Sequence, residues 1–119
     1  FLFKNDFFPF KKKKAFFAMT AHVIFDKIDS KNTATHSKKM IDLIRNKLGF
    51  RNLIISDDLC MKSLKGSLKE KTVKTFRAGC NLALHCNGNL KEMRIVGNNS
   101  PYINKFIIKK TSQFYKILS

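Results

Sequence analysis

The stretch Leu53–Met61, LIISDDLCM, indicates most about how this chain folds. Its first three residues are apolar, and a run this short and apolar predicts a buried strand over Asn52–Ile55. Ser56 ends the run, and Asp57 and Asp58 follow directly. In a parallel α/β sheet, a polar group just past a strand lies at the carboxyl edge, where active sites are built. One aspartate could instead cap the next helix, and the pair alone does not separate these alternatives.

Two further apolar stretches, Ala15–Val23 and Leu82–Leu84, predict strands that pair with the first in parallel. Their polar ends would bring His22, Asp57 and His85 to the same edge of the sheet. Three helices are predicted from their caps and from apolar residues at helical spacing. Their boundaries run from Ser37 to Gly49, from a Ser67/Glu70 capping box to Gly79, and from Ser100-Pro101 to about Leu118. Residues 26–36 predict a polar loop, so the chain alternates strand and helix.

Four sequence blocks occur in an order that is typical of a known family. They are MTAHV (Met19–Val23), LGF (Leu48–Phe50), SDDLCM (Ser56–Met61) and AGCNLALHCNG (Ala78–Gly88). Together they resemble the bacterial β-N-acetylhexosaminidases of glycoside hydrolase family 3. The stretches Asp6–Phe10 and Lys91–Met93 fit the same pattern, and the second is similar to the alphaproteobacterial branch. The likeness runs from about Asp6 to about Pro101.

The resemblance implies a role for several residues at the predicted edge. It makes Asp57 the nucleophile that attacks the anomeric carbon of a sugar, whereas Asp58 is expected to hold the loop through backbone N–H groups. His22 and Met61 are candidate substrate-binding residues; for both, a purely structural role is an open alternative. Family members carry Asp where this chain has Asn81, which we expect to alter a local hydrogen bond and not the chemistry.

The resemblance also implies an architecture larger than this chain. A (β/α)8 barrel needs roughly 250 residues, so 119 residues supply about three βα units. We therefore interpret residues 1–119 as one domain, the C-terminal part of a family 3 catalytic barrel. The acid/base of the family is a His–Asp dyad on a loop upstream of MTAHV, so the chain by itself is expected to be inactive. A three-unit slice would leave sheet edges unpaired, which favours aggregation.

The implied function is a retaining glycosidase that removes terminal N-acetylglucosamine from peptidoglycan-derived muropeptides. The implied partner is an N-acetylglucosamine-containing saccharide, with no cofactor, no specific nucleic acid and no membrane, and with a monomeric intact form. Two alternatives stay open from the residues: a basic module that binds an anionic polymer, and a degenerate gene product without catalytic activity.

The net charge of +16 bears on the first alternative. Only four of the 24 basic residues are arginine, the better reader of phosphates and base edges. The abundance of lysine is typical of an AT-rich genome, and the run Lys11–Lys14 predicts a solvated loop or helix end.

The cysteines Cys60, Cys80 and Cys86 form no C-x-x-C pair and predict neither a disulfide framework nor a zinc site. Although His85 lies near two of them, a small apolar cysteine on a buried strand is the favoured interpretation, and no metal is expected. Free cysteines favour a reducing cytoplasm. No stretch has the apolar length of a membrane span.

Overall fold

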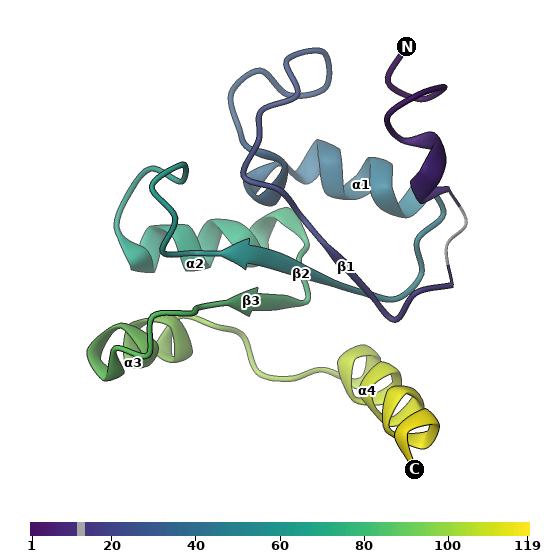
Figure 1. The fold of residues 1–119 in the computed structure, drawn as a ribbon. Helices are drawn as coiled ribbons and strands as arrows, with labels where there is room; N and C mark the ends of the chain where they lie inside the picture. Colours follow the sequence, from purple (N-terminus) through teal and green to yellow (C-terminus); the bar gives the residue numbers. More distant parts are fainter. Residues whose placement is uncertain (12–13) are drawn as a thin grey trace.

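The core of the molecule is a three-stranded parallel sheet in the order β1-β2-β3 (Figure 1). The computed structural model describes residues 1–11 and 14–119. The strands are β1 (Phe17–Met19), β2 (Leu53–Asp58) and β3 (Leu82–Leu84). Phe17 pairs with Leu53, and Ile55 pairs with Leu82. The predicted parallel α/β sheet is confirmed.

A helix follows each strand. The α-helices are α1 (Lys38–Asn46), α2 (Leu68–Ala78), α3 (Leu90–Asn98) and α4 (Lys105–Leu118). Two short 3₁₀ helices, η1 (Phe8–Phe10) and η2 (Ala34–His36), precede β1 and α1. The second forms within the stretch that we predicted to be a loop.

The predicted strand boundaries need two corrections. The first strand is shorter than Ala15–Val23, because its ladder with β2 covers only three residue pairs. The central strand is longer than Asn52–Ile55: it continues through Ser56 to Asp58, with a register shift against β3 between Ile55 and Asp58. Ser56 does not end the strand because its hydroxyl accepts the N–H of Leu84 at 3.0 Å and so serves the sheet.

The predicted N-terminal caps of the first two helices are confirmed, whereas α1 ends at Asn46 with Lys47 as its C-cap and not at Gly49. Ser37 accepts the N–H of Met40, and Ser67 and Glu70 form the reciprocal capping box of α2. Gly79 ends α2 in the left-handed conformation, with φ of +114°. Because a side chain is costly at such φ values, glycine is the residue expected there.

The C-terminal helices differ from the sequence prediction. Helix α3 was not predicted at all, although Asn89 caps it by accepting the N–H of Glu92. The last helix does not begin at Ser100-Pro101: Ser100 instead donates to Val96 O at the end of α3. The residue before a proline avoids helical backbone, and α4 begins only after Asn104, whose side chain accepts the N–H of Ile107.

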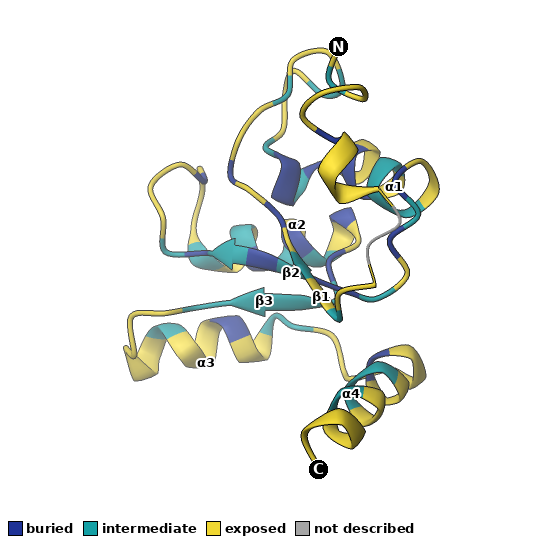
Figure 2. Ribbon diagram, turned by 45° about the vertical axis from the view of Figure 1, so that its right-hand side comes forward, coloured by how far each residue is buried: buried dark blue, intermediate teal, exposed yellow. Residues whose placement is uncertain are grey.

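Helices α1 and α2 cover one face of the sheet. Ile54 of β2 is fully buried between Ile41 of α1 and Ala78 of α2, with Phe50 and Cys80 completing this cluster. The outer strands β1 and β3 each pair on one side only, and Figure 2 shows the exposed and half-buried residues along them. The predicted unpaired sheet edges are therefore present in the described structure.

Within residues 1–11 and 14–119, no helix combines the length and the apolar character that a membrane crossing requires. Of the basic run Lys11–Lys14, residues 12–13 lie outside the described residues, and the two flanking lysines are exposed.

Candidate active site

Asp57 lies in β2, one residue before its carboxyl end, and not on a loop after the strand as predicted. Its side chain is half-buried, and its Oδ1 accepts the N–H of Asp58 at 2.8 Å. No other hydrogen bond reaches this carboxylate from residues 1–11 or 14–119. One oxygen of Asp57 is thus held at a fixed position by its own strand, and the other is available to a ligand.

Asp58 has the structural role that we expected. Its Oδ1 accepts the backbone N–H groups of Cys60 at 3.1 Å and Cys86 at 3.2 Å, so that it joins the turn after β2 to the segment after β3. Burial acts to raise the pKa of Asp58, but the N–H donors of Cys60 and Cys86 outweigh it and the net shift is downward. The group is held as a carboxylate.

His22 is buried at the same edge with both ring nitrogens engaged. Nδ1 is hydrogen-bonded to Thr35 Oγ1 at 2.8 Å, and Nε2–H donates to the backbone carbonyl of Asp58 at 2.9 Å. Thr35 is in turn hydrogen-bonded to Thr20 Oγ1 at 2.8 Å. These bonds fit the structural alternative for His22, in which it fixes the loop after β1 against the end of β2.

Met61 lies in the turn that follows β2. Its N–H donates to Asp58 O at 3.1 Å, and 43% of its surface is exposed. The side chain is therefore accessible beside the carboxyl edge, where it could contact a substrate.

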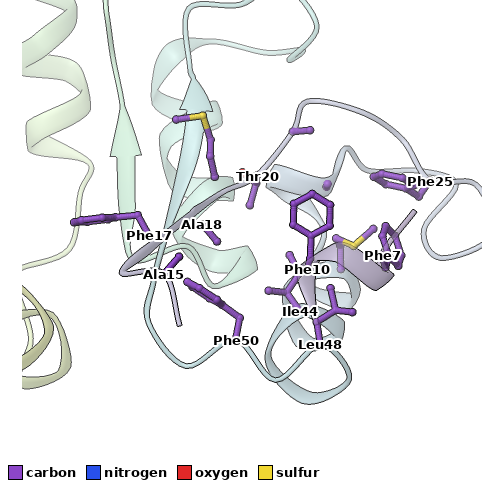
Figure 3. A pocket seen from close by; sticks show the side chains of 14 residues that line it. Phe7, Phe10, Ala15, Phe17, Ala18, Thr20, Phe25, Ile44, Leu48 and Phe50 are labelled. Atoms are coloured by element: carbon purple, nitrogen blue, oxygen red, sulfur yellow. The ribbon is translucent and has the colours of Figure 1, made fainter. Parts of the chain in front are cut away.

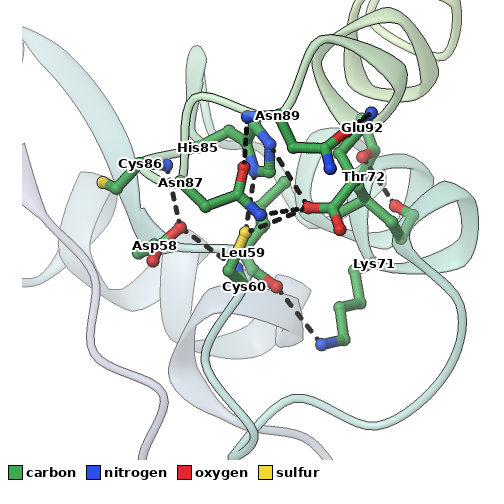
Figure 4. A network of polar contacts seen from close by, with 11 residues as sticks. Asp58, Leu59, Cys60, Lys71, Thr72, His85, Cys86, Asn87, Asn89 and Glu92 are labelled. Atoms are coloured by element: carbon green, nitrogen blue, oxygen red, sulfur yellow. Dashed lines mark hydrogen bonds and ion pairs between the residues drawn. The ribbon is translucent and has the colours of Figure 1, made fainter.

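Sequence reasoning missed a second group of side chains at this edge, which Figure 4 shows. Cys60 Sγ lies 2.8 Å from His85 Nδ1 and 3.7 Å from Glu92 Oε2. The amide of Asn87 also donates to Glu92 Oε2. Burial, and after it the charges of Asp58 and Glu92, raise the pKa of the Cys60 thiol.

A usable signal for this group was present in the sequence. Cys60 comes two residues after the end of β2, and His85 directly follows β3, so a parallel pairing brings them to one edge. The interpretation of the cysteines as small buried side chains holds for Cys80 and is wrong for Cys86, which is exposed. Cys60 is half-buried and contacts His85.

At the opposite edge, Asn81 occupies the position where the resemblance expects Asp. Its Oδ1 accepts from Arg45 Nη2 at 2.7 Å and from the N–H of Ile54 at 2.9 Å. Asn81 in place of Asp therefore changes a local hydrogen-bond acceptor at the amino ends of β2 and β3, and the residue it contacts in β2, Ile54, is three positions before Asp57.

A large apolar hollow is separate from these groups. It has a volume of about 500 Å³, and the N-terminal segment, β1 and α1 line it (Figure 3). Phe7, Phe10, Phe17 and Phe50 contribute to its wall, but Asp57 does not. Its described lining is apolar except for Thr20, whose hydroxyl is hydrogen-bonded to Thr35, so the carboxyl edge of the sheet is the candidate active site.

Comparison with known proteins decides the family. Residues 1–109 match the family model described as "Glycosyl hydrolase family 3 N terminal domain". The chain belongs to glycosyl hydrolase family 3. The match spans all three strands and the first three α-helices, so the sheet described above is the fold of the family 3 domain. The predicted fold class, about three βα units of a (β/α)8 barrel, is confirmed.

Individual relatives are named as β-hexosaminidases or as a β-N-acetylglucosaminidase. A β-hexosaminidase of Nitrosomonas eutropha is 45% identical over 71 residues, covering 58% of this chain and 20% of the relative. A β-hexosaminidase of Psychromonas ingrahamii is 31% identical over 122 residues, covering 98% of this chain and 34% of the relative. The solved β-N-acetylglucosaminidase from Thermotoga maritima is 30% identical with a TM-score of 0.67, covering 92% of this chain and 27% of that one. The chain spans a fifth to about a third of the length of these relatives.

Proposed function

We propose that residues 1–119 form the C-terminal part of the catalytic barrel of a retaining β-N-acetylhexosaminidase. The substrate would carry terminal N-acetylglucosamine, and the family resemblance favours muropeptides from peptidoglycan recycling in the cytoplasm. The observation that carries the proposal is the position of Asp57. It lies one residue before the carboxyl end of the middle parallel strand, and one of its oxygens is unengaged among the described residues.

The two adjacent aspartates have different proposed roles because they make different hydrogen bonds. Asp58 uses Oδ1 to hold two backbone N–H groups, so it is suited to positioning the turn. Asp57 accepts one N–H from its own strand and keeps an oxygen for the anomeric carbon. This division favours Asp57 as the nucleophile and Asp58 as its support.

The proposed chemistry is a double displacement. A carboxylate oxygen of Asp57 forms a bond to the anomeric carbon while the bond from that carbon to the leaving oxygen breaks. The leaving oxygen takes a proton from the acid/base, which the family resemblance places upstream of MTAHV and outside residues 1–119. Water then adds to the anomeric carbon, gives its proton to the same base, and releases Asp57. His22 and Met61 would border the sugar.

The test replaces Asp57 in the complete polypeptide that contains these residues. We expect Asp57→Asn to lower kcat by several orders of magnitude, because no neighbour can form the covalent bond in its place. The measurement is release of a chromogenic aglycone from an aryl β-N-acetylglucosaminide, combined with mass-spectrometric location of a sugar trapped from a slow fluorinated substrate.

Asp58→Asn is the matched control, since it is also an isosteric loss of charge. It should reduce activity much less and lower the melting temperature more. Labelled sugar on Asp58, or near-normal turnover by Asp57→Ala, would show that the assignment of the nucleophile is wrong. Residues 1–119 alone should give no turnover, because their nucleophile lacks its proton donor.

A further inference from the structure

Asp58, Cys60 and His85 form a cluster of side chains that could hold a metal ion. Of the three, only Asp58 has a role in the proposed glycosidase chemistry, as a support. One ligand atom from each lies within 4.8 Å of the other two, and all three residues are half-buried. The sulfur and the imidazole are closest, with Cys60 Sγ 2.8 Å from His85 Nδ1. In Figure 4 the sulfur of Cys60 lies against the ring of His85, and the carboxylate of Asp58 lies beside them.

Each of the three groups is held in position by the fold. The carboxylate of Asp58 is fixed through Oδ1 by two backbone N–H groups, which leaves Oδ2 for another ligand. A ligating carboxylate is typically supported in this way by hydrogen bonds to its other atoms. His85 directly follows β3, and Cys60 lies in the turn after β2. Because the two strands pair, these ligands cannot move far apart.

The second observation that points to a ligand is the other nitrogen of His85. Nε2 is buried and has no hydrogen-bond partner among the described residues, yet the carboxylate of Glu92 lies 3.5 Å from it. A metal-bound histidine usually donates its free N–H to a carboxylate, which fixes the ring and strengthens the ligand. A small rotation of Glu92 in the first turn of α3 would complete that arrangement.

The donor set selects the kind of ion. Thiolate sulfur, imidazole nitrogen and carboxylate oxygen together suit zinc or cobalt better than magnesium or calcium, which prefer oxygen alone. Zinc bonds of about 2.3 Å to sulfur and 2.0 Å to nitrogen would place the two atoms about 3.5 Å apart in a tetrahedral site. The side chains of Cys60 and His85 would need to open by less than about 1 Å from their present contact.

The charges around the cluster also favour a cation. Asp57, Asp58 and Glu92 are three of only eight acidic residues in a chain of net charge +16. The nearby ammonium group of Lys71 does not occupy the cluster, because it donates to the backbone carbonyls of Leu59 and Met61.

We infer that Asp58, Cys60 and His85 bind a zinc-like divalent transition-metal ion, with Glu92 as the positioning residue for His85. Three protein ligands leave a fourth position open to water or to another ligand. A bound ion would cross-link the turn after β2 to the end of β3, beside Asp57. The inference rests on these side chains and is independent of the glycosidase proposal.

The first experiment uses the unmodified chain, with reductant present, and follows alkylation of each cysteine by mass spectrometry. We expect Zn²⁺ to slow the alkylation of Cys60 at least tenfold and to leave exposed Cys86 unchanged. Cys86 is the internal control, since it is one residue from His85 but outside the cluster. No protection of Cys60, or equal protection of both thiols, would overturn the inference.

The second experiment titrates Co²⁺ and reads the thiolate-to-cobalt charge-transfer band, with Zn²⁺ displacing the cobalt. Cys60→Ser should abolish the band and weaken Zn²⁺ binding at least about a hundredfold, and Glu92→Gln should weaken it by about ten- to a hundredfold. The control Cys86→Ser should bind as the unmodified chain does. A cobalt spectrum without the sulfur band, or equal losses for Cys60→Ser and Cys86→Ser, would contradict the assigned ligands. Circular dichroism of each variant separates loss of ligand from loss of fold.

Discussion

Polar side chains gather at both ends of β2, and the two groups use their hydrogen bonds differently. At the amino end, Arg45 donates from Nη1 to the carbonyls of Phe50 at 3.1 Å and Asn52 at 2.5 Å. It also donates from Nη2 to Asn81 Oδ1 at 2.7 Å. All these partners are backbone or amide oxygens of the segments that enter β2 and β3, so this end joins strands to α1.

The carboxyl end is less completely paired. Among the described residues, His85 Nε2 has no hydrogen-bond partner, and Asp57 is held only by the adjacent N–H. In parallel sheets of this class, the amino ends serve stability and the carboxyl ends serve chemistry. The two ends therefore differ in how completely their polar groups are hydrogen-bonded, more than in how many polar groups they have.

The largest expected effect is loss of the amino-end cluster in Arg45→Met. Methionine keeps the apolar length of the side chain but leaves three acceptors without their donor. We therefore expect the free energy of unfolding to fall by about 3 kcal/mol. Urea denaturation followed by circular dichroism measures the change. The exposed Arg77 of α2 provides the control: Arg77→Met should change stability by less than about 0.5 kcal/mol. Equal losses for the two variants would show that the hydrogen bonds of Arg45 do not cause the loss of stability.

Gly79→Ala should have the next largest effect, because this residue turns the chain from α2 into the amino end of β3. Its φ is +114°, and an added Cβ would lie 2.9 Å from Cγ2 of Ile41. The strain of alanine in the left-handed region and this close contact together should lower the free energy of unfolding by about 2 kcal/mol. Gly97→Ala in α3 is the matched control, since its Cβ meets nothing within 4 Å; it should stabilise by up to about 1 kcal/mol. Thermal melts of both variants give the comparison, and the same sign for both would contradict it.

Asn81→Asp should strengthen the amino end. The new carboxylate would accept from Arg45 and from the N–H of Ile54, in place of the neutral amide oxygen. A charge-assisted hydrogen bond of this kind should raise the free energy of unfolding by about 1 kcal/mol at neutral pH. The gain should vanish when Arg45 is replaced by Met, which a double-mutant cycle in urea measures. An undiminished gain in that background would show that the pair is not its cause.

The smallest effect concerns pH and the carboxyl side of the fold. His36 Nε2 is hydrogen-bonded to Lys71 O at 3.1 Å, where η2 meets α2. Burial, and after it the positive groups of Lys74, His22 and Lys71, lower the pKa of His36 from its usual 6.5, although the bond to Lys71 acts in the opposite direction. As the pH drops, His36 is therefore protonated at a higher pH in the unfolded chain than in the folded one. The free energy of unfolding should fall as the pH drops from 7 through the folded-state pKa of His36.

Urea midpoints between pH 7 and pH 5 measure this slope, and His36→Gln should flatten it. Arg45→Met should leave the slope unchanged, because the groups at the amino end do not titrate in this range. A slope that survives in His36→Gln would assign the pH dependence to another group.

Local signals in the sequence were enough for much of the fold. The capping box at Ser67 and Glu70 and the glycine at position 79 each depend on residues close in sequence, and both were predicted. The start of α4 was missed because two signals competed: Pro101 is compatible with a first helical turn, yet the side chain of Asn104 makes the observed cap. Propensity alone does not rank such alternatives.

The candidate site was predictable only in part, for a related reason. Asp57 follows an apolar run and could be found from the sequence. The positions of Cys60 and His85 just past two strands place them at one edge, but whether they touch is set by the register of β2 against β3, which shifts between Ile55 and Asp58 and which no local pattern encodes. The partners of Arg45 likewise lie up to 36 positions away, so its role required the structure.

The bonds around His22 have a direction that follows from one fixed acceptor. The carbonyl of Asp58 has no hydrogen to give, so neutral His22 must carry its proton on Nε2 and must accept at Nδ1. Thr35 is then the donor to His22 and shares its one hydroxyl hydrogen with the carbonyl of Ala21 at 3.2 Å, and Thr20 becomes the donor to Thr35. The hydroxyls of Thr20, directly after β1, and Thr35, in η2, thus form with His22 a one-way relay that terminates on the backbone carbonyl of Asp58. Reversing any single member would force every other hydroxyl in the relay to turn.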